Sequence, residues 1–283
     1  MEQRIHSYLR GTSELRILHL TASQAAITGN PIKSMRAGIL DGILLTDVFS
    51  RGECQAIRQQ LEENIHGMIK SDFPDVMRSF FLGLNLNLAE DYFSTYWSEA
   101  SRFNRQVEDL LSGIGGLQMR ILKVLSSLYG GIRFTAPPGP TGDTEHMITT
   151  FRCHLEGGFI PAHFDNEQDR RSSYNFLNTQ IRGDLFSFVL VFGAPLGGGQ
   201  LQIFDCRRGS RMFHMNGGAE DAQHIDLTGM ASQSFSLQPG CMLIFNSGQL
   251  LHRLNPIEGS TPRWTACSFM SESKDGSCVY LWG

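Results

Sequence analysis

The second half of the chain is a series of short strand-like segments separated by glycine and proline turns. Residues 148–155 and 263–270 alternate between apolar and polar side chains, whereas residues 185–192 form a nearly continuous apolar run. LQIFD follows Gly197-Gly198-Gly199, and CMLIFN follows Pro239-Gly240. Alternation predicts strands with one buried face, and the continuous run predicts a strand buried on both faces. Short strands between such turns are typical of a β-sandwich or a jelly-roll barrel.

Helical periodicity is the main pattern of residues 50–130. Ser50 and Glu53 form a capping box, and apolar side chains then recur at helical spacing. A second apolar stripe runs from Phe103 to Leu125, and we expect the glycines inside it to break or kink the helix. These glycines are Gly113, Gly115 and Gly116.

A Pro- and Gly-rich segment, residues 136–142, separates the two halves. We therefore predict one domain, residues 1–283, that is mainly β with flanking helices. Residues 1–140 would form mostly helical support, and residues 141–283 would form the barrel core and a C-terminal tail. We expect the aromatic end of that tail, Tyr280-Leu281-Trp282, to dock on the fold rather than to bind a ligand.

Composition excludes several classes of protein. Hydrophobic residues make up 41% of the 283 positions, which is enough for a sizeable core, and only 18% are charged. A net charge of -4 disfavours an unspecific binder of nucleic acid or anionic membranes. Six scattered cysteines without a C-x-x-C pair, and no signal-peptide pattern at residues 1–20, predict reduced thiols and a cytoplasmic location. Apolar runs are too short to span a membrane. We expect a monomer or a homodimer.

Three His-x-acid pairs raise the question of a metal site. A mononuclear iron site needs two imidazoles and one carboxylate on one face of the metal, with the other face open. Residues i and i+2 of a strand share one side, so His-x-Asp or His-x-Glu can supply two ligands and a distant His the third. One such pair is a weak signal, because a chain with 9 His and 28 acids is expected to contain one by chance. The pairs are His154 and Glu156, His163 and Asp165, and His224 and Asp226.

Sequence context favours one of these pairs. The partner histidine should lie on a late strand, and His252 fits because it follows PGCMLIFNSGQLL, which is typical of strand, turn and strand. His224 lies too close to His252 for the intervening barrel strands. His154 and Glu156 remain possible, although Glu156 adjoins Gly157-Gly158 at a strand end. We prefer His163, Asp165 and His252 as metal ligands.

A basic residue follows the last proposed ligand. Arg263 and Thr265 lie two positions apart on a predicted strand, so both face one side. An arginine with a neighbouring hydroxyl can hold a carboxylate by charge-assisted hydrogen bonds. A dicarboxylate co-substrate that chelates iron would need such an anchor at its far end.

His-x-Asp, a distant His and a trailing Arg-x-Thr resemble the iron(II)/2-oxoglutarate-dependent oxygenases, which have a double-stranded β-helix (jelly-roll, cupin-like) fold. Further segments resemble the freestanding halogenases of hapalindole-type alkaloid pathways. These segments are DGILLTDVFSR (41–51), PLGGGQL (195–201), PGCMLIFNSGQLLHRL (239–254), TPRWT (261–265) and SFMSESKDGSCVYLWG (268–283). The halogenases have Gly where this chain has Asp165, and that vacancy lets chloride bind iron. With Asp165 present, we predict oxygenation rather than halogenation.

The resemblance implies iron(II), 2-oxoglutarate and O2 as cofactor and co-substrates, with release of succinate and CO2. It implies a small-molecule substrate that needs no carrier protein, hydroxylated at an unactivated C–H bond. His163, Asp165 and His252 would hold iron, and Arg263 and Thr265 would bind the distal carboxylate of 2-oxoglutarate.

Two further residues are candidates for the same cavity. Arg152, two positions before His154, would help to bind 2-oxoglutarate, unless it is a solvated or paired strand residue. Ser187 would face the substrate, unless it is a small core residue. Residues 166–182, which include Arg170 and Arg171, and residues 205–235 could each form a lid over the site.

Other functions stay open from the sequence. The same residues could carry out desaturation, cyclisation or halogenation. An enzyme of this chemistry that modifies protein or nucleic acid is a second possibility, but no long basic groove is visible. A cupin-like protein that binds a ligand or a metal without redox chemistry belongs to another class, and it would not need Arg263 at this spacing.

Overall fold

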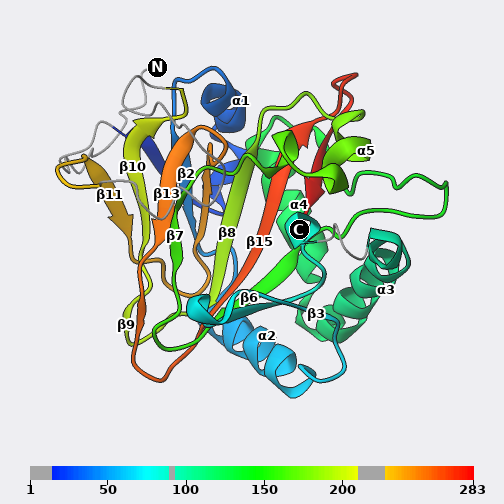
Figure 1. Cartoon of the computed structure of the whole chain (residues 1–283). Coiled ribbons are helices and arrows are strands. Elements are labelled where there is room, and N and C mark those ends of the chain that lie inside the picture. Colours follow the sequence, from blue (N-terminus) through cyan, green and yellow to red (C-terminus); the bar gives the residue numbers. More distant parts are fainter. Residues whose placement is uncertain (1–14, 89–92, 210–226) are drawn as a thin grey trace.

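The structure is a computed structural model that describes residues 15–88, 93–209 and 227–283. Two β-sheets face each other within these residues (Figure 1). The major sheet contains, in spatial order, β1 (Ile17–Thr21), β2 (Gly42–Thr46), β12 (Met242–Phe245), β8 (Phe186–Gly193), β15 (Arg263–Glu272), β6 (Thr150–His154), β4 (Ser79–Leu82) and β3 (Lys70–Asp72). In addition, β16 (Cys278–Trp282) pairs with β15 and with β5 (Arg133–Thr135).

The minor sheet contains β11 (Ser232–Phe235), β10 (Leu201–Arg207), β13 (Leu250–Leu254) and β7 (Ile160–His163). A short ladder joins β9 (Gly197–Gly198) to β14 (Ile257–Glu258). This arrangement of two facing sheets is the double-stranded β-helix, as predicted.

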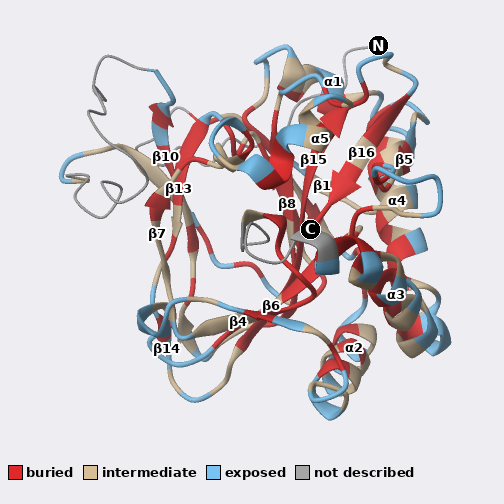
Figure 2. Cartoon of the chain, turned by 45° about the vertical axis from the view of Figure 1, so that its right-hand side comes forward, coloured by how far each residue is buried: buried red, intermediate tan, exposed pale blue. Residues whose placement is uncertain are grey.

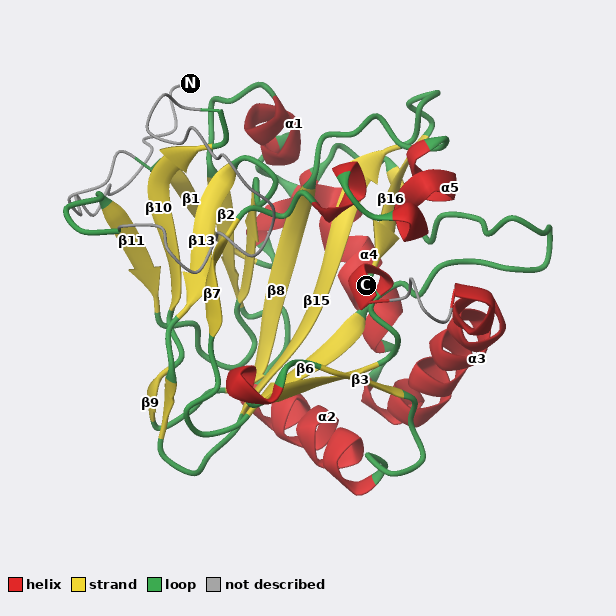
Figure 3. Cartoon of the chain, viewed as in Figure 1, coloured by secondary structure: helices red, strands yellow, loops and turns green. Residues whose placement is uncertain are grey.

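Helices cover the outer face of the major sheet (Figure 3). They are α1 (Pro31–Arg36), α2 (Arg51–Glu63), α3 (Phe93–Leu111) and α4 (Leu117–Leu128), whereas the short α5 (Asn175–Asn178) belongs to the segment between β7 and β8. The predicted capping box of Ser50 and Glu53 starts α2. The glycines after α3 break the helical stripe as expected, because Gly115 and Gly116 take positive φ between α3 and α4.

Strand β8 shows why its sequence is almost continuously apolar. Leu190 and Phe192 pack in the core that includes the helices, whereas Val191 packs with Leu201 and Ile203 of the minor sheet. Burial is accordingly concentrated in the central strands, and exposed residues lie on the outer sides of the helices (Figure 2). Trp282, near the C-terminus, is fully buried, so the aromatic tail docks on the fold as predicted.

The N-terminal half is less helical than its sequence pattern suggests. Strands β3 and β4 lie inside residues 50–130, and β4 pairs with β6. Strands β1 and β2 also join the major sheet, where β2 pairs with β12. Without β2, the apolar strand β12 would have an unpaired edge. The strand that covers this edge is about two hundred residues away in sequence. Local periodicity cannot report such a partner.

The remaining sequence expectations concern cysteines and membranes. All six cysteines lie within the described residues and none forms a disulfide. In the described part of the chain, every helix is too short or too polar to cross a membrane.

The turn before β12 gives a test of the fold. Gly240 has φ +88°, and its peptide N–H donates to Val191 O (2.8 Å), while a Cβ there would strike Phe49 O. Gly240→Ala should therefore lower the free energy of unfolding by about 2–4 kcal/mol. Gly229 also has positive φ, but a Cβ at that position would meet open space. Gly229→Ala should lower the free energy of unfolding by only about 1–2 kcal/mol, because only the positive φ opposes the alanine side chain. Equal losses in urea unfolding would contradict the proposed clash.

Candidate metal centre

Two strands of the minor sheet bring the predicted metal ligands together. Strand β13 pairs antiparallel with β7, and His252 lies directly opposite His163 in this ladder. Asp165 follows His163 by two residues, and its peptide N–H donates to Ser247 O (3.1 Å). The imidazole rings of the two histidines lie 4.3 Å apart between centroids. Residues that are distant in sequence thus meet because the register of the β7–β13 pairing places the two histidines opposite each other.

Backbone carbonyls orient both imidazoles. His163 Nδ1 lies 2.8 Å from Pro161 O, and His252 Nδ1 lies 2.9 Å from Leu250 O. A carbonyl can only accept, so each Nδ1 carries a proton and Nε2 is the nitrogen through which each neutral imidazole can bind a metal. His163 Nε2 lies 3.4 Å from Asp165 Oδ1, and His252 Nε2 lies 3.6 Å from Asp165 Oδ2. Both free nitrogens therefore point at the carboxylate.

The charge states suit metal binding. Burial would raise the pKa of the Asp165 carboxyl, but the neighbouring imidazoles, with His252 first, hold it well below its usual range. Burial, followed by the nearby His163, lowers the pKa of His252 to about 4. At neutral pH the cluster therefore contains an ionised carboxylate beside a neutral imidazole, which are the protonation states of metal ligands.

The spacing of these three groups fits a single ion. One ligand atom from each residue lies within 4.8 Å of the others. Adjacent ligands at right angles around a metal, with bonds of about 2.1 Å, are about 3 Å apart, so small adjustments would complete the site. Two imidazoles and one carboxylate on one side, with the other side open, form the facial triad of non-haem iron(II) sites.

The cluster opens into a cavity between the two sheets, which we call the inner cavity. Besides the cluster, its lining includes Arg152, His154, Ser187 and Arg263. Strand β6 pairs with β15 so that His154 faces Arg263 and Arg152 faces Thr265. The alternation of both strands directs these side chains to the same face of the major sheet.

Arg263 is the least expected of these side chains in a protein interior. It is only 4% exposed, and burial lowers its pKa to about 10, so it remains a cation at neutral pH. Within the described residues, no carboxylate pairs with it. A buried cation without an anion is costly. The position is therefore prepared for an anionic ligand.

Two of the other three predicted residues, Arg152 and Ser187, line the inner cavity, and Thr265 does not. The Arg152 guanidinium stacks over the Phe81 ring at 4.6 Å, and Ser187 lines the inner cavity. Thr265 is fully buried outside the lining, and its hydroxyl accepts a hydrogen bond from Cys267 Sγ at 3.5 Å. Arg263 and Thr265 share a face as expected, but only Arg263 reaches the cavity.

The two alternative His-x-acid pairs have different outcomes. His154 is buried at the end of β6, whereas Glu156 is exposed beyond the strand. Among the residues that the structure describes, His154 therefore has no acidic partner for a metal site. His224 and Asp226 lie outside the described residues.

A second, larger cavity of about 310 Å³ adjoins the cluster, and we call it the mouth cavity. It shares Arg152, His163 and Asp165 with the inner cavity. Its apolar wall includes Phe73, Met77, Phe81 and Phe269. Sequence reasoning misses the first three of these residues, because the periodicity of residues 50–130 favours helices. The one available signal is the apolar run Phe80-Phe81-Leu82 before Gly83, which is typical of a strand and turn.

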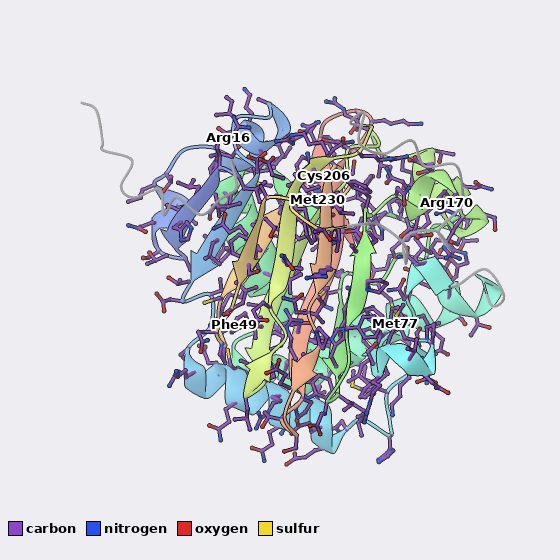
Figure 4. All side chains as sticks on the ribbon, turned by 60° about the vertical axis from the view of Figure 1, so that its left-hand side comes forward. Arg16, Phe49, Met77, Arg170, Cys206 and Met230 are labelled. Atoms are coloured by element: carbon purple, nitrogen blue, oxygen red, sulfur yellow. The ribbon has the colours of Figure 1, made fainter. Side chains whose placement is uncertain are left out.

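One of the two predicted lids reaches the mouth cavity. Within residues 166–182 the chain forms short helical turns, and Glu167, Arg170 and Arg171 line the cavity. Arg171 pairs with Glu167, and Arg170 is exposed. Arg170 and Met77 lie on the same side of the molecule (Figure 4). Residues 210–226 of the other predicted lid are not described.

Comparison with known proteins decides the family. A model of the family described as carrier-protein-independent halogenase WelO5 matches residues 15–283. The chain belongs to the WelO5 family. It is therefore an enzyme of the iron(II)/2-oxoglutarate oxygenase superfamily, whose members use iron(II), 2-oxoglutarate and O2. A search of curated proteins finds no match.

Solved structures support the fold of this WelO5-family chain. An N-substituted L-amino acid dioxygenase from Burkholderia ambifaria AMMD, in complex with alpha-KG, has a TM-score of 0.58 at 19% identity. The alignment covers 89% of this chain and 90% of that one. A second structure of an N-substituted L-amino acid dioxygenase from Burkholderia ambifaria AMMD has a TM-score of 0.56 at 17% identity, and its alignment also covers 89% of this chain and 90% of that one.

The geometry of the cluster leads to a test of metal binding. At about 100 times its dissociation constant, Mn(II) should raise the free energy of unfolding by about 2.7 kcal/mol, because only the folded chain presents the three ligands together. His252→Ala should remove most of this gain, as measured by thermal unfolding with and without Mn(II). His19→Ala, a change at an exposed histidine of β1, is the matched control and should keep the gain. An undiminished gain in His252→Ala would place the metal elsewhere.

Proposed function

We propose that this protein hydroxylates an unactivated C–H bond of a freestanding small molecule. In this proposal His163, Asp165 and His252 hold iron(II), and 2-oxoglutarate is the co-substrate. The observation that carries it is the Asp165 carboxylate, which lies 3.4 Å and 3.6 Å from the Nε2 atoms of the two histidines. With iron(II) and 2-oxoglutarate bound, the site would activate O2 and release succinate and CO2.

Asp165 is the reason to favour hydroxylation over halogenation. The halogenases that this chain resembles have Gly at that position, which leaves room for chloride on iron. Here an ionised carboxylate occupies that room, beside the Nε2 atoms of two imidazoles. Membership of the WelO5 family favours halogenation as the second candidate, but a chloride ligand would have to displace Asp165 from its place between the histidines. Desaturation and cyclisation would use the same protein groups.

The two arginines of the inner cavity suit the dianion 2-oxoglutarate. Arg263 would bind the distal carboxylate through charge-assisted, bidentate hydrogen bonds. Arg152 adds a second cation on the neighbouring strand, opposite Thr265. Thr265 is buried behind the lining, so it would act only indirectly, through its contact with Cys267.

The mouth cavity suits a small molecule with an apolar body. Phe73, Met77, Phe81 and Phe269 would pack against the substrate and exclude water from the reacting C–H bond. Ser187 lines the inner cavity, where it could meet the part of the substrate nearest the metal. The solved relative named as an N-substituted L-amino acid dioxygenase is compatible with a small substrate of this kind.

The role of Asp165 can be tested by removing its side chain. Asp165→Gly should lose hydroxylation, because the metal loses its carboxylate ligand, and should gain chloride-dependent spectral changes or halogenated product. Turnover is measured as succinate release in a screen of free amino acids, alkaloids and nucleosides, with product masses read by mass spectrometry. Unchanged hydroxylation in Asp165→Gly would show that another carboxylate binds the metal.

The role of Arg263 can be tested by co-substrate binding. Anaerobic titration of the iron(II) protein with 2-oxoglutarate should produce a weak visible charge-transfer band. Arg263→Leu should weaken 2-oxoglutarate binding by about 10- to 100-fold, the range expected when a charged hydrogen bond is lost. Arg133→Leu, at an exposed arginine of β5, should bind like the wild type. Absence of the band in the wild type would refute the proposed cofactor chemistry.

A further inference from the structure

His154 is a buried polar residue in the inner cavity that is not one of the three proposed metal ligands. It is 2% exposed, and it lines the cavity together with the metal cluster and Arg263. Its Nδ1 atom is buried without a hydrogen-bond partner among the described residues. Buried polar atoms are almost always paired. An unpaired imidazole in a cavity therefore points to a ligand group that completes its hydrogen bonds.

The position of His154 indicates which ligand group that would be. In the ladder between β6 and β15, His154 lies directly opposite Arg263. Directly opposite residues of an antiparallel pair have their Cβ atoms about 5 Å apart and project from the same face. An anion held by Arg263 would therefore lie within reach of the imidazole. His163 and His252, in contrast, extend from the facing sheet.

The charge state of His154 also fits an anion-binding role beside two arginines. Burial, followed by Arg263 and Arg152, holds the pKa of His154 well below its usual range. The imidazole is therefore neutral at neutral pH and adds no third positive charge to the cavity. A neutral imidazole still has one N–H donor.

We propose that His154 binds the distal carboxylate of 2-oxoglutarate together with Arg263, by donating a ring N–H. This inference rests on the proposed co-substrate. A carboxylate offers about four acceptor sites, and a bidentate arginine uses two of them. In a closed cavity the remaining acceptors need donors. Thr265, the expected second donor, lies outside the lining, and His154 takes its place.

The test compares two ligands and two substitutions. Titration of the charge-transfer band gives the affinity of the anaerobic iron(II) protein for 2-oxoglutarate and for 2-oxopentanoate, which has a methyl group in place of the distal carboxylate. His154→Leu should weaken 2-oxoglutarate binding about tenfold or more, the effect of losing a hydrogen bond to a charged group, and leave 2-oxopentanoate binding nearly unchanged. His154→Asn, whose side-chain amide keeps an N–H donor at about the position of Nδ1, should recover most of the affinity for 2-oxoglutarate.

Controls separate this role from a structural one. Cys153 lies beside His154 on β6, is equally buried and faces the other side of the sheet. Cys153→Ala should bind both ligands like the wild type. Should His154→Leu not fold, His154→Met replaces it, because its side chain is of similar length and also lacks an N–H donor. In each folded variant, the ratio of the affinities for 2-oxoglutarate and 2-oxopentanoate is compared with the ratio in the wild type.

The outcomes distinguish the inference from the proposed function. A wild type without a band would refute the proposed co-substrate. A normal wild-type band, with His154 variants that weaken both ligands equally or neither, would overturn the role of His154 and leave the proposed function intact.

Discussion

The site depends on the antiparallel pairing of β7 with β13. This pairing sets His252 opposite His163, and each imidazole is then fixed by a carbonyl of its own strand, at Leu250 and Pro161. Both Nε2 atoms consequently face the carboxylate of Asp165. A slip of one residue in this ladder would turn one imidazole to the opposite face of the sheet. The register of two short strands is therefore what makes a metal centre out of three separate polar residues.

The major sheet, which faces the cluster, supplies positive charge. The minor sheet carries the cluster with its ionised carboxylate, whereas β6 and β15 of the major sheet carry the cations Arg152 and Arg263 and the neutral His154. These groups have no carboxylate partners among the described residues, and the burial of Arg263 and His154 opposes stability unless a ligand binds. The apolar packing on the other face of the major sheet, against α2, α3 and α4, offsets that penalty. The helices thus stabilise a fold whose interior contains a cation without an anionic partner among the described residues.

Sequence patterns predict the parts whose signals are local. The capping box at Ser50 and the break at the glycines after α3 follow from backbone chemistry within a few residues. The doubly buried strand β8 follows from its apolar run. Strands β3 and β4 fall inside a region whose periodicity favours helices, because three or four residues are too few to show a period of two. The wall of the mouth cavity, Phe81 in particular, escapes sequence reasoning for that reason.

By itself, the sequence determined the chemistry available to the site: a His-x-Asp pair with carboxylate instead of glycine, a distant histidine and a trailing arginine. Only the tertiary structure decided which groups meet. It placed His252 opposite His163, left Glu156 exposed, and put His154 rather than Thr265 on the cavity wall beside Arg263. The physical reason is that alternation along a strand assigns a side chain to a face, whereas pairing between strands decides what that face meets.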